Sequence, residues 1–262
     1  TSTPIPEKQR FLVGTQKVMK LDLVEPFLLD ASQQQELHNM AVDAAGSGCD
    51  GVIVADFGLG LFTGTNLRRM CMQLRPHARV MAGDVSGKRS NLRKMHGMDL
   101  LCPSERELRD SLHEYDDGLP AVVAKLLEET SSRSALVTMG ADGLLVFESP
   151  RDDAQGWDRR LRSEHVPALA SFAIDPLGCG DALLTAATLG LAAGGSRLAA
   201  GFIGSLAAAT QAQRLGNLPV SATDLRQGVT RVHSAHLAFA TAEVIASRSV
   251  RAGALEPTAK AS

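Results

Sequence analysis

Apolar and polar residues follow one another in several different patterns along this chain, and each pattern predicts one kind of element. Around Gly14 and Thr15 they alternate, in "EKQRFLVGTQKVMKLDL", which predicts two short strands at an edge or in a flap. The continuous β-branched run "GVIVAD" at 51–56 is typical of a strand buried in a parallel sheet. The stretch "ASQQQELHNMAVDAAGSG" predicts a helix that Ser32 caps and that the glycines near residue 46 end.

Strands and helices of these kinds alternate as far as Leu145. The predicted helices span 31–48, 64–76, 104–115 and 120–130. The predicted strands span 51–56, 79–84, 99–103 and 134–148, the last one folded back on itself at 140–143. A polar stretch follows, which predicts a loop or a marginal hairpin, and three helical runs begin at residue 180. This alternation predicts the α/β class, with a right-handed, mostly parallel sheet and helices on both of its faces.

No internal repeat and no low-complexity linker interrupts the chain, so we predict one domain over residues 1–262. Within it we assign residues 1–25 to the flap strands, 26–250 to the core, and 251–262 to a frayed tail.

The composition argues against several classes of function. The chain has 262 residues, 44% of them hydrophobic, and a net charge of −2, which provides no basic face for nucleic acid or an anionic membrane. No apolar run is long enough to span a membrane, and no signal peptide opens the sequence. The cysteines are scattered without a CxxC pair, which favours reduced thiols over disulfides or zinc. We therefore predict a cytoplasmic protein that binds neither nucleic acid nor a membrane.

Polar residues follow three of the predicted strands directly. Asp56 ends one strand, Asp84 ends the next, and Thr138 to Gly140 follow "ALV". In open α/β sheets, ligands bind outside the carboxyl ends of the strands, so we expect the chemistry at this edge. An aspartate there can also be a plain helix cap or turn residue, and that alternative stays open.

The segment "IDPLGCGDALLTAATLGLAAG" at 174–194 contains the strongest candidate site. A helix that begins near Gly180 has unpaired amides in its first turn, and Gly178 and Gly180 let those amides converge on an anion such as phosphate. A carboxylate beside a phosphate is repulsive unless it removes a proton from an attacking hydroxyl, which is the role that Asp181 would have. Alternatively, the glycines only permit a turn and Asp181 only caps the helix.

"DPLGCGDALLTAA" is similar to the second signature of the PfkB (ribokinase-like) sugar kinases. Other segments match the family in the same order: "RVMAGDVSGK", "LLCPSERE", "ALVTMGADGLLVF" and "AAATQAQRLGN". The nearest likeness is the D-glycero-D-manno-heptose 7-phosphate kinase branch, which "EKQRFLVGTQKVMKLD", "VADFGLG" and "HVPALASFAIDPLGCGD" also resemble. The resemblance covers roughly Glu7 to Leu225. It implies a ribokinase-like three-layer α/β/α fold with a mostly parallel sheet and a small β flap at the N-terminus.

The resemblance also implies a function, which is ATP-dependent transfer of a phosphoryl group to a hydroxyl of a sugar or sugar phosphate. Asp181 would be the general base, and the amides of Gly178, Cys179 and Gly180 would form the anion hole. Glu107 would help to hold Mg²⁺ through water. Thr138 and Gly140 would line the nucleotide phosphates, and Gly143 and Gly216 would shape the nucleotide pocket. Asp175 would serve either a monovalent cation or the loop geometry. Family members pair through their flap strands, so the resemblance implies a homodimer.

The sequence departs from the family pattern at several positions. Ser104 stands where the metal-associated Asn is expected, Leu59 and Ser86 each stand where a Lys is expected, and Cys179 replaces an Ala. Lys88 is the candidate substitute for the cation that is missing at Ser86. The family's N-terminal part, with its first signature and sugar-binding Gly-Gly segment, does not precede the flap in this sequence. We therefore expect either a piece of a longer polypeptide or an incomplete sugar site.

Two other functions stay open at this point. The first is a kinase-derived binding or assembly module that keeps the fold but has lost turnover. The second is a nicotinamide-dependent oxidoreductase, because glycines follow a strand in "DFGLGLFTG". Their spacing is Gly-x-Gly-x-x-x-Gly rather than Gly-x-Gly-x-x-Gly, and a turn of small residues explains it equally well.

Overall fold

The computed structural model describes residues 6–14, 16–25, 29–86, 91–150, 155, 160–170, 172–216 and 218–235. The chain divides into two compact units, Thr1–Pro219 and Val220–Ser262, which we describe separately. In the second unit, residues 222–235 are helical, and Ser221 and Asp224 form reciprocal hydrogen bonds at the start of this helix.

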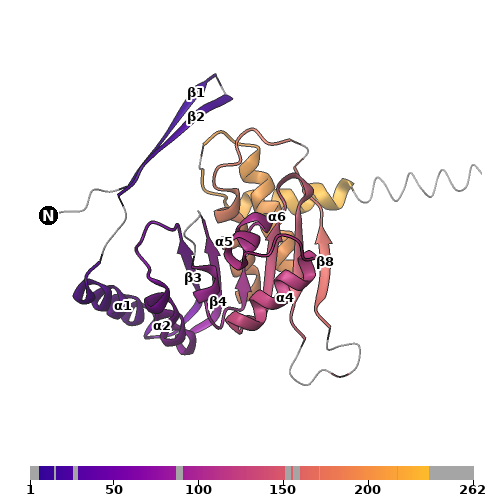
Figure 1. The fold of residues 1–262 in the computed structure, drawn as a ribbon. Helices are drawn as coiled ribbons and strands as arrows, with labels where there is room; N and C mark the ends of the chain where they lie inside the picture. The colour runs from indigo at the N-terminus through magenta and orange to yellow at the C-terminus, as the bar shows by residue number, and fades with distance from the viewer. Residues whose placement is uncertain are drawn as a thin grey trace, which may run out of the picture. The chain divides into compact units, whose positions relative to one another are not determined.

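A six-stranded sheet with the order β3-β4-β5-β6-β7-β8 forms the centre of the first unit. In Figure 1, β3 and β4 lie toward one side of this sheet and β8 toward the other. Its strands are β3 (Cys49–Asp56), β4 (Ala78–Val85), β5 (Leu100–Leu101), β6 (Ser134–Thr138), β7 (Leu144–Glu148) and β8 (Arg162–Val166). The pairs from β3 to β6 are parallel, and β7 and β8 continue the sheet antiparallel. The prediction of a mostly parallel sheet is confirmed. The predicted loop or marginal hairpin after residue 148 lies partly outside the described residues, and its last part forms β8, which pairs antiparallel with β7.

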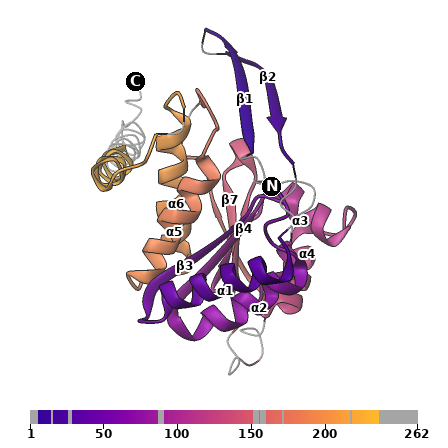
Figure 2. The ribbon, with the colours of Figure 1, turned by 90° about the vertical axis from the view of Figure 1, so that its left-hand side faces the viewer.

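Helices cover both faces of this sheet, as predicted (Figure 2). The helices α5 (Cys179–Ala192) and α6 (Arg197–Ala212) lie on one face. The other face carries α1 (Ala31–Ala45), α2 (Gly64–Leu74), α3 (Glu105–Leu112) and α4 (Leu119–Thr130). In the described part of the chain, short 3₁₀ helices lie between the longer elements, namely η1 (Arg75–His77), η2 (Leu92–Lys94) and η3 (Gly140–Asp142).

The inner strands β4 to β7 are mostly buried and apolar because each face packs against its own layer of helices, whereas the edge strand β8 is exposed except at Val166. In β6, Ala135 and Val137 belong to the core under α2 to α4, whereas Leu136 between them belongs to the core under α5 and α6. Successive side chains of a strand point to opposite faces, so a strand that is covered twice needs an uninterrupted apolar run. On α6, a Cβ at Gly201 would lie 2.8 Å from the side chain of Val146, so glycine permits the close approach of α6 to the sheet.

The start of α1 differs from the prediction, which gave Ser32 as the cap. Asp30 is the N-cap: its carboxylate accepts the amide of Gln33 at 2.9 Å, and the Gln33 side chain accepts the amide of Asp30 at 3.0 Å. This capping box satisfies two first-turn amides at once, which a serine placed inside the helix cannot do.

The two predicted flap strands are present as an antiparallel pair, β1 (Glu7–Val13) and β2 (Gln16–Leu23). Phe11 pairs with Met19, and a bulge follows between Phe11 and Leu12. Directly paired residues share one face of a ribbon, so Phe11 and Met19 lie on the same face, and both are exposed.

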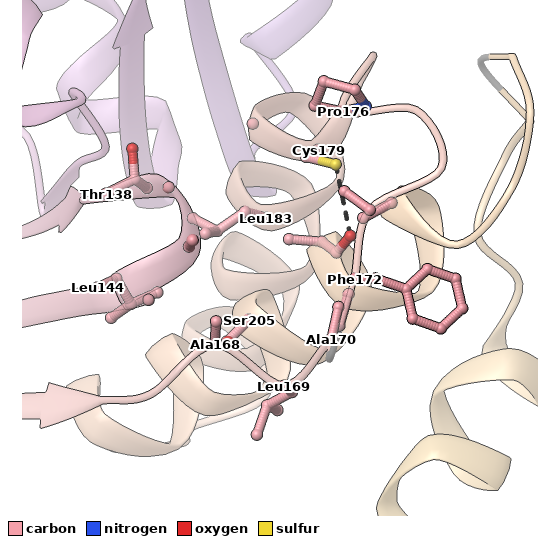
Figure 3. Close-up of a pocket in the computed structure, with 18 residues that line it drawn as sticks. Thr138, Leu144, Ala168, Leu169, Ala170, Phe172, Pro176, Cys179, Leu183 and Ser205 are labelled. Atoms are coloured by element: carbon pink, nitrogen blue, oxygen red, sulfur yellow. Dashed lines mark hydrogen bonds between the residues drawn. The ribbon is translucent and has the colours of Figure 1, made fainter. Parts of the chain in front are cut away.

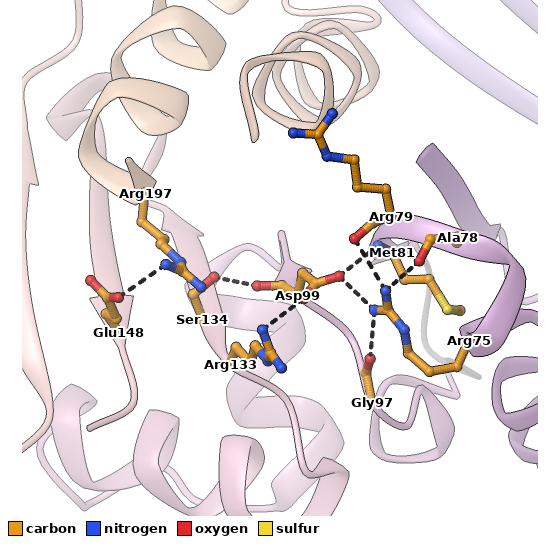
Figure 4. Close-up of polar contacts among 10 residues, drawn as sticks. All are labelled: Arg75, Ala78, Arg79, Met81, Gly97, Asp99, Arg133, Ser134, Glu148 and Arg197. Carbon is orange, nitrogen blue, oxygen red and sulfur yellow. Dashed lines mark hydrogen bonds and ion pairs between the residues drawn. The ribbon is translucent and has the colours of Figure 1, made fainter. Parts of the chain in front are cut away.

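At the amino ends of the strands, a polar network joins the loops and strand starts (Figure 4). The guanidinium of Arg75 contacts Asp99 at 2.5 Å and donates to the carbonyl of Ala78 at 2.6 Å. Asp99 also accepts the amide of Met81 at 2.9 Å, and its carbonyl accepts the hydroxyl of Ser134. The network therefore ties together the starts of β4 and β6 and the segment before β5, at the edge opposite the expected site.

Among the described residues, no helix is both long enough and apolar enough to cross a membrane.

Candidate active site

The first turn of α5 contains the predicted amides of Gly178, Cys179 and Gly180 and the carboxylate of Asp181. Gly178 is the N-cap, with φ 77°, a left-handed conformation that glycine adopts without strain. Among the described residues, no carbonyl accepts a hydrogen bond from the amides of Gly178 or Gly180. The amide of Cys179 makes a long bond of 3.3 Å to the carbonyl of Pro176. Asp181 follows in the same turn, and it is exposed rather than turned into the core.

The carboxyl of Asp84 lies at this edge of the sheet, where the charges of two other carboxylates act on it. Asp84 is the second-last residue of β4, and its side chain is half-buried. Its Oδ1 is a buried atom without a hydrogen-bond partner in the described part of the chain. Burial, together with the negative charges of Glu107 and Asp181, raises the pKa of Asp84 to about 7. The other oxygen, Oδ2, lies 4.0 Å from where a Cβ of Gly180 would stand. The carboxyl of Asp84 therefore lies beside the amide turn of α5.

Glu107 forms part of the cap of α3. Its Oε2 accepts the amide of Ser104 at 2.9 Å and the hydroxyl of Ser104 at 2.6 Å, and the Ser104 hydroxyl accepts the amide of Glu107 at 3.3 Å. The serine that departs from the family pattern is thus the N-cap in a capping box. One carboxylate oxygen of Glu107 is used inside the protein.

A cavity of about 360 Å³ opens in front of this turn (Figure 3). Four segments line it: the β6–β7 turn, the loop residues 168–170 and 172–173, the start of α5 and the C-terminal half of α6. The predicted site residues in its lining are Thr138, Gly140, Gly143, Cys179 and Gly180. Most of the other lining residues are alanines or larger apolar residues. An apolar cavity of this size with a few polar groups at one end is typical of a small-molecule site.

Gly143 brings two walls of the cavity together. A Cβ at this position would lie 2.2 Å from the carbonyl oxygen of Val166 and 2.6 Å from the amide nitrogen of Ala168. Its φ of 89° is also unfavourable for any other residue. Glycine is therefore what allows the end of β8 to pass against the turn after β6.

The thiol of Cys179 also lies in this wall, where it donates to the carbonyl of Ala208 at 3.5 Å. Burial and the nearby charge of Asp175 raise the pKa of this thiol, so it stays protonated and is a poor nucleophile.

The loop before α5 is tied to the turn after α6. Asp175 accepts the amide of Leu177 at 3.0 Å and the amide of Gly216 at 3.2 Å. Gln211, on α6, donates its side-chain amide to the carbonyls of Leu177 and Gly216, at 3.0 and 2.7 Å. Gly216 does not line the cavity, but it is held against the amide turn through these bonds.

Two further residues that the sequence marked as candidates, Lys88 and Asp56, remain to be placed. Lys88 lies outside the described residues. Asp56 is buried, and its carboxylate accepts the amide of Gly58 and both the main-chain and side-chain amides of Asn91, so it is a structural residue.

Two residues of this region were not identified from the sequence as part of the site. The sequence gave no role to Asp84 beyond its place at a strand end, and it gave no role to Gln211. The signal for Gln211 was a polar residue inside the Ala-rich run "AAATQAQ".

Comparison with known proteins gives one family and one fold. The chain is 28% identical over 235 residues to the bifunctional protein HldE of Methylobacillus flagellatus, which covers 88% of this chain and 46% of that protein. It is 27% identical over 230 residues to the bifunctional protein HldE of Azorhizobium caulinodans, and this match covers 87% of this chain and 45% of that protein. The chain thus spans about half the length of the curated relatives it matches.

Solved structures share the fold. Phosphofructokinase-2 from Escherichia coli in complex with potassium superposes with a TM-score of 0.65 at 16% identity, over 82% of this chain and 67% of that one. Ribokinase from Thermotoga maritima gives a TM-score of 0.61 at 16% identity, over 88% of this chain and 71% of that one. The ribokinase-like fold is therefore confirmed. Residues 31–223 match the description "pfkB family carbohydrate kinase". This chain belongs to the pfkB family of carbohydrate kinases.

Proposed function

We propose that this chain transfers the terminal phosphoryl group of ATP to a hydroxyl of a sugar or sugar phosphate. The observation that carries the proposal is the first turn of α5, where the exposed carboxylate of Asp181 stands beside amides of Gly178 and Gly180 that no described carbonyl occupies. In this reading Asp181 removes the proton of the attacking hydroxyl. The amides hold the transferring phosphoryl group, and a preorganised donor of this kind typically lowers a barrier by about 3 kcal/mol.

The cavity in front of α5 supports a nucleotide as the phosphoryl donor. Its volume of about 360 Å³ and its small apolar lining suit the base and sugar of a nucleotide. Thr138 and Gly140 line both this cavity and a second groove that Ser104 also lines, which supports their role as contacts of the nucleotide phosphates. Gly143 shapes the wall, and Gly216 acts on the site through Asp175 and Gln211.

The carboxylates fit a divalent metal ion such as Mg²⁺, which prefers carboxylate oxygens and retains several waters. The unpaired Oδ1 of Asp84 and the free side of Glu107 would hold it, through water and the nucleotide phosphates. No group of three or more ligating side chains in the described part of the chain is placed to hold a metal ion. The ion would neutralise the charge of the phosphates during transfer.

The acceptor and the assembly are also proposals. The resemblance to heptose-phosphate kinases and to the HldE proteins favours a heptose phosphate as the acceptor. The exposed apolar face of the flap, which carries Phe11, Met19 and Leu21, supports pairing of two copies through β1 and β2, because an uncovered apolar ribbon promotes association. We retain residues 1–262 as a single kinase domain.

A second function, a nucleotide-binding module without turnover, is supported by the environment of Glu107. Its Oε2 already accepts two hydrogen bonds from Ser104, so one oxygen is less available to a metal and its waters. Such a module would bind ATP without consuming it.

The test is the variant Asp181→Asn, measured by ADP release over a panel of sugars and sugar phosphates and by calorimetric titration with ATP and Mg²⁺. Loss of the general base should lower turnover at least about a hundredfold, with ATP affinity within a few fold of the unsubstituted chain. Asp43→Asn, an exposed carboxylate on α1, is the matched control and should change neither quantity. Unchanged turnover in Asp181→Asn would refute the proposal. ATP binding without ADP release from the unsubstituted chain would favour the second function.

A further inference from the structure

Gln211 joins the loop before α5 to the turn after α6 from a buried position. Only 1% of its surface is exposed, and its side-chain Nε2 donates to the carbonyl oxygen of Leu177 at 3.0 Å and to that of Gly216 at 2.7 Å. An amide nitrogen carries two hydrogens, so the two carbonyls match its donors one for one. A buried polar group is retained at low cost only when it is satisfied in this way.

The oxygens around Nε2 form a set that a hard cation would otherwise attract. Two backbone carbonyls converge there, and the carboxylate of Asp175 is bonded to the amides of the same two residues, Leu177 and Gly216. Carbonyl and carboxylate oxygens are the ligands of hard cations, and one structure of similar fold is a complex with potassium. In this chain the two carbonyls already have a neutral donor between them. These residues therefore do not fit a bound monovalent cation.

The bond to Leu177 also fixes an amide of the candidate anion hole. The carbonyl of Leu177 and the N–H of Gly178 belong to one planar trans peptide unit, so they point in opposite directions. Holding the carbonyl on Gln211 turns the N–H of Gly178 away from α6, and no described carbonyl accepts it. Asp175 fixes the preceding peptide unit in the same way, through the N–H of Leu177.

We propose that Gln211 is a positioning residue that takes the place of a monovalent cation, holding the loop 175–178 so that the Gly178 amide faces the transferred phosphoryl group. The role of the amide rests on the proposed kinase function. The independence of the loop from a cation does not rest on the kinase function, because it follows from the hydrogen bonds of Gln211 alone.

The experiment compares the unsubstituted chain with Gln211→Ala in potassium chloride and in tetramethylammonium chloride at the same ionic strength. Two readouts are taken: the affinity for ATP with Mg²⁺ by calorimetry, and the midpoint of thermal unfolding without nucleotide. Gln211→Glu is the second variant, because it keeps the shape of the side chain and replaces the donor by an oxygen. Gln213→Ala, an exposed glutamine two residues later, is the matched control.

We expect the unsubstituted chain and Gln213→Ala to give the same affinity and midpoint in both salts. Loss of two buried hydrogen bonds should weaken ATP binding by Gln211→Ala about tenfold in tetramethylammonium, and potassium should restore most of it. Potassium should also raise the unfolding midpoint of Gln211→Ala and Gln211→Glu.

A dependence of the unsubstituted chain on potassium would overturn the assignment, as would Gln211 variants that potassium does not restore. If no protein binds ATP, the proposed function fails, and the unfolding midpoints alone decide whether Gln211 replaces a cation.

Discussion

Asp84 offers a direct test of the electrostatics at the carboxyl end of the sheet, through the substitution Asp84→Asn. The carboxyl has one buried oxygen without a partner, and burial together with the charges of Glu107 and Asp181 raises its pKa to about 7 from an ordinary value of 3.8. Asparagine has nearly the same shape and carries no charge. The variant therefore removes the cost of ionising this group and little else.

The size and sign of the effect follow from proton linkage. Below pH 3.8 the carboxyl is protonated in both the folded and the unfolded chain, so it contributes no pH dependence. Between pH 3.8 and about 7 only the unfolded chain ionises it, so the free energy of unfolding falls as the pH rises. The interval corresponds to about 4 kcal/mol, at about 1.4 kcal/mol for each pH unit. This value is an upper limit because the side chain is half-buried.

The assay is urea unfolding followed by circular dichroism between pH 4 and pH 8.5, with EDTA present. Asp84→Asn should exceed the unsubstituted chain in unfolding free energy by up to about 4 kcal/mol at pH 8.5, by about half of that near pH 5.4, and by almost nothing near pH 4. Other carboxyl groups are common to both proteins and cancel in the difference, and Asp43→Asn is the matched control. A difference that is constant with pH, or that shrinks as the pH rises, would refute the reasoning.

Two further predictions concern stability at other places. Gly143→Ala forces a Cβ to within 2.2 Å of the Val166 carbonyl, so it should lower the free energy of unfolding by about 3 kcal/mol or more and weaken ATP binding. Gly194→Ala, with φ 88° but open space, should cost only about 1 kcal/mol, and equal losses would contradict the role of the contact. Arg75→Ala leaves Asp99 without its main cation and should cost about 2 kcal/mol, with ATP affinity unchanged because the network lies at the opposite edge of the sheet. Arg79→Ala, whose side chain is exposed, is the control, and a matching loss of stability would show that the ion pair contributes little.

Local patterns were sufficient to predict most of the elements. The β-branched run at 51–56 became β3, and the alternating segment around Gly14 became the ribbon of β1 and β2. The burial expected for the first run was wrong in part, because β3 is an edge strand of the sheet in the described residues and Ile53 is 40% exposed. The error at Ser32 arose because several nearby polar residues can all cap a helix. The reciprocal hydrogen bonds with Gln33, which make Asp30 the cap, are visible only in the structure.

The same distinction, between features set by neighbouring residues and features set by distant segments, applies to the candidate site. By itself the sequence determined the helix that begins near Gly180, the glycines before it and the carboxylate of Asp181, because all of these depend on residues within one turn. The tertiary structure decided that Asp56 is structural while Asp84 has a buried, unpaired oxygen. It also decided that Gln211 reaches Leu177, 34 residues away. Hydrogen bonding and burial between distant segments depend on where the fold brings them together, and no local pattern carries that information.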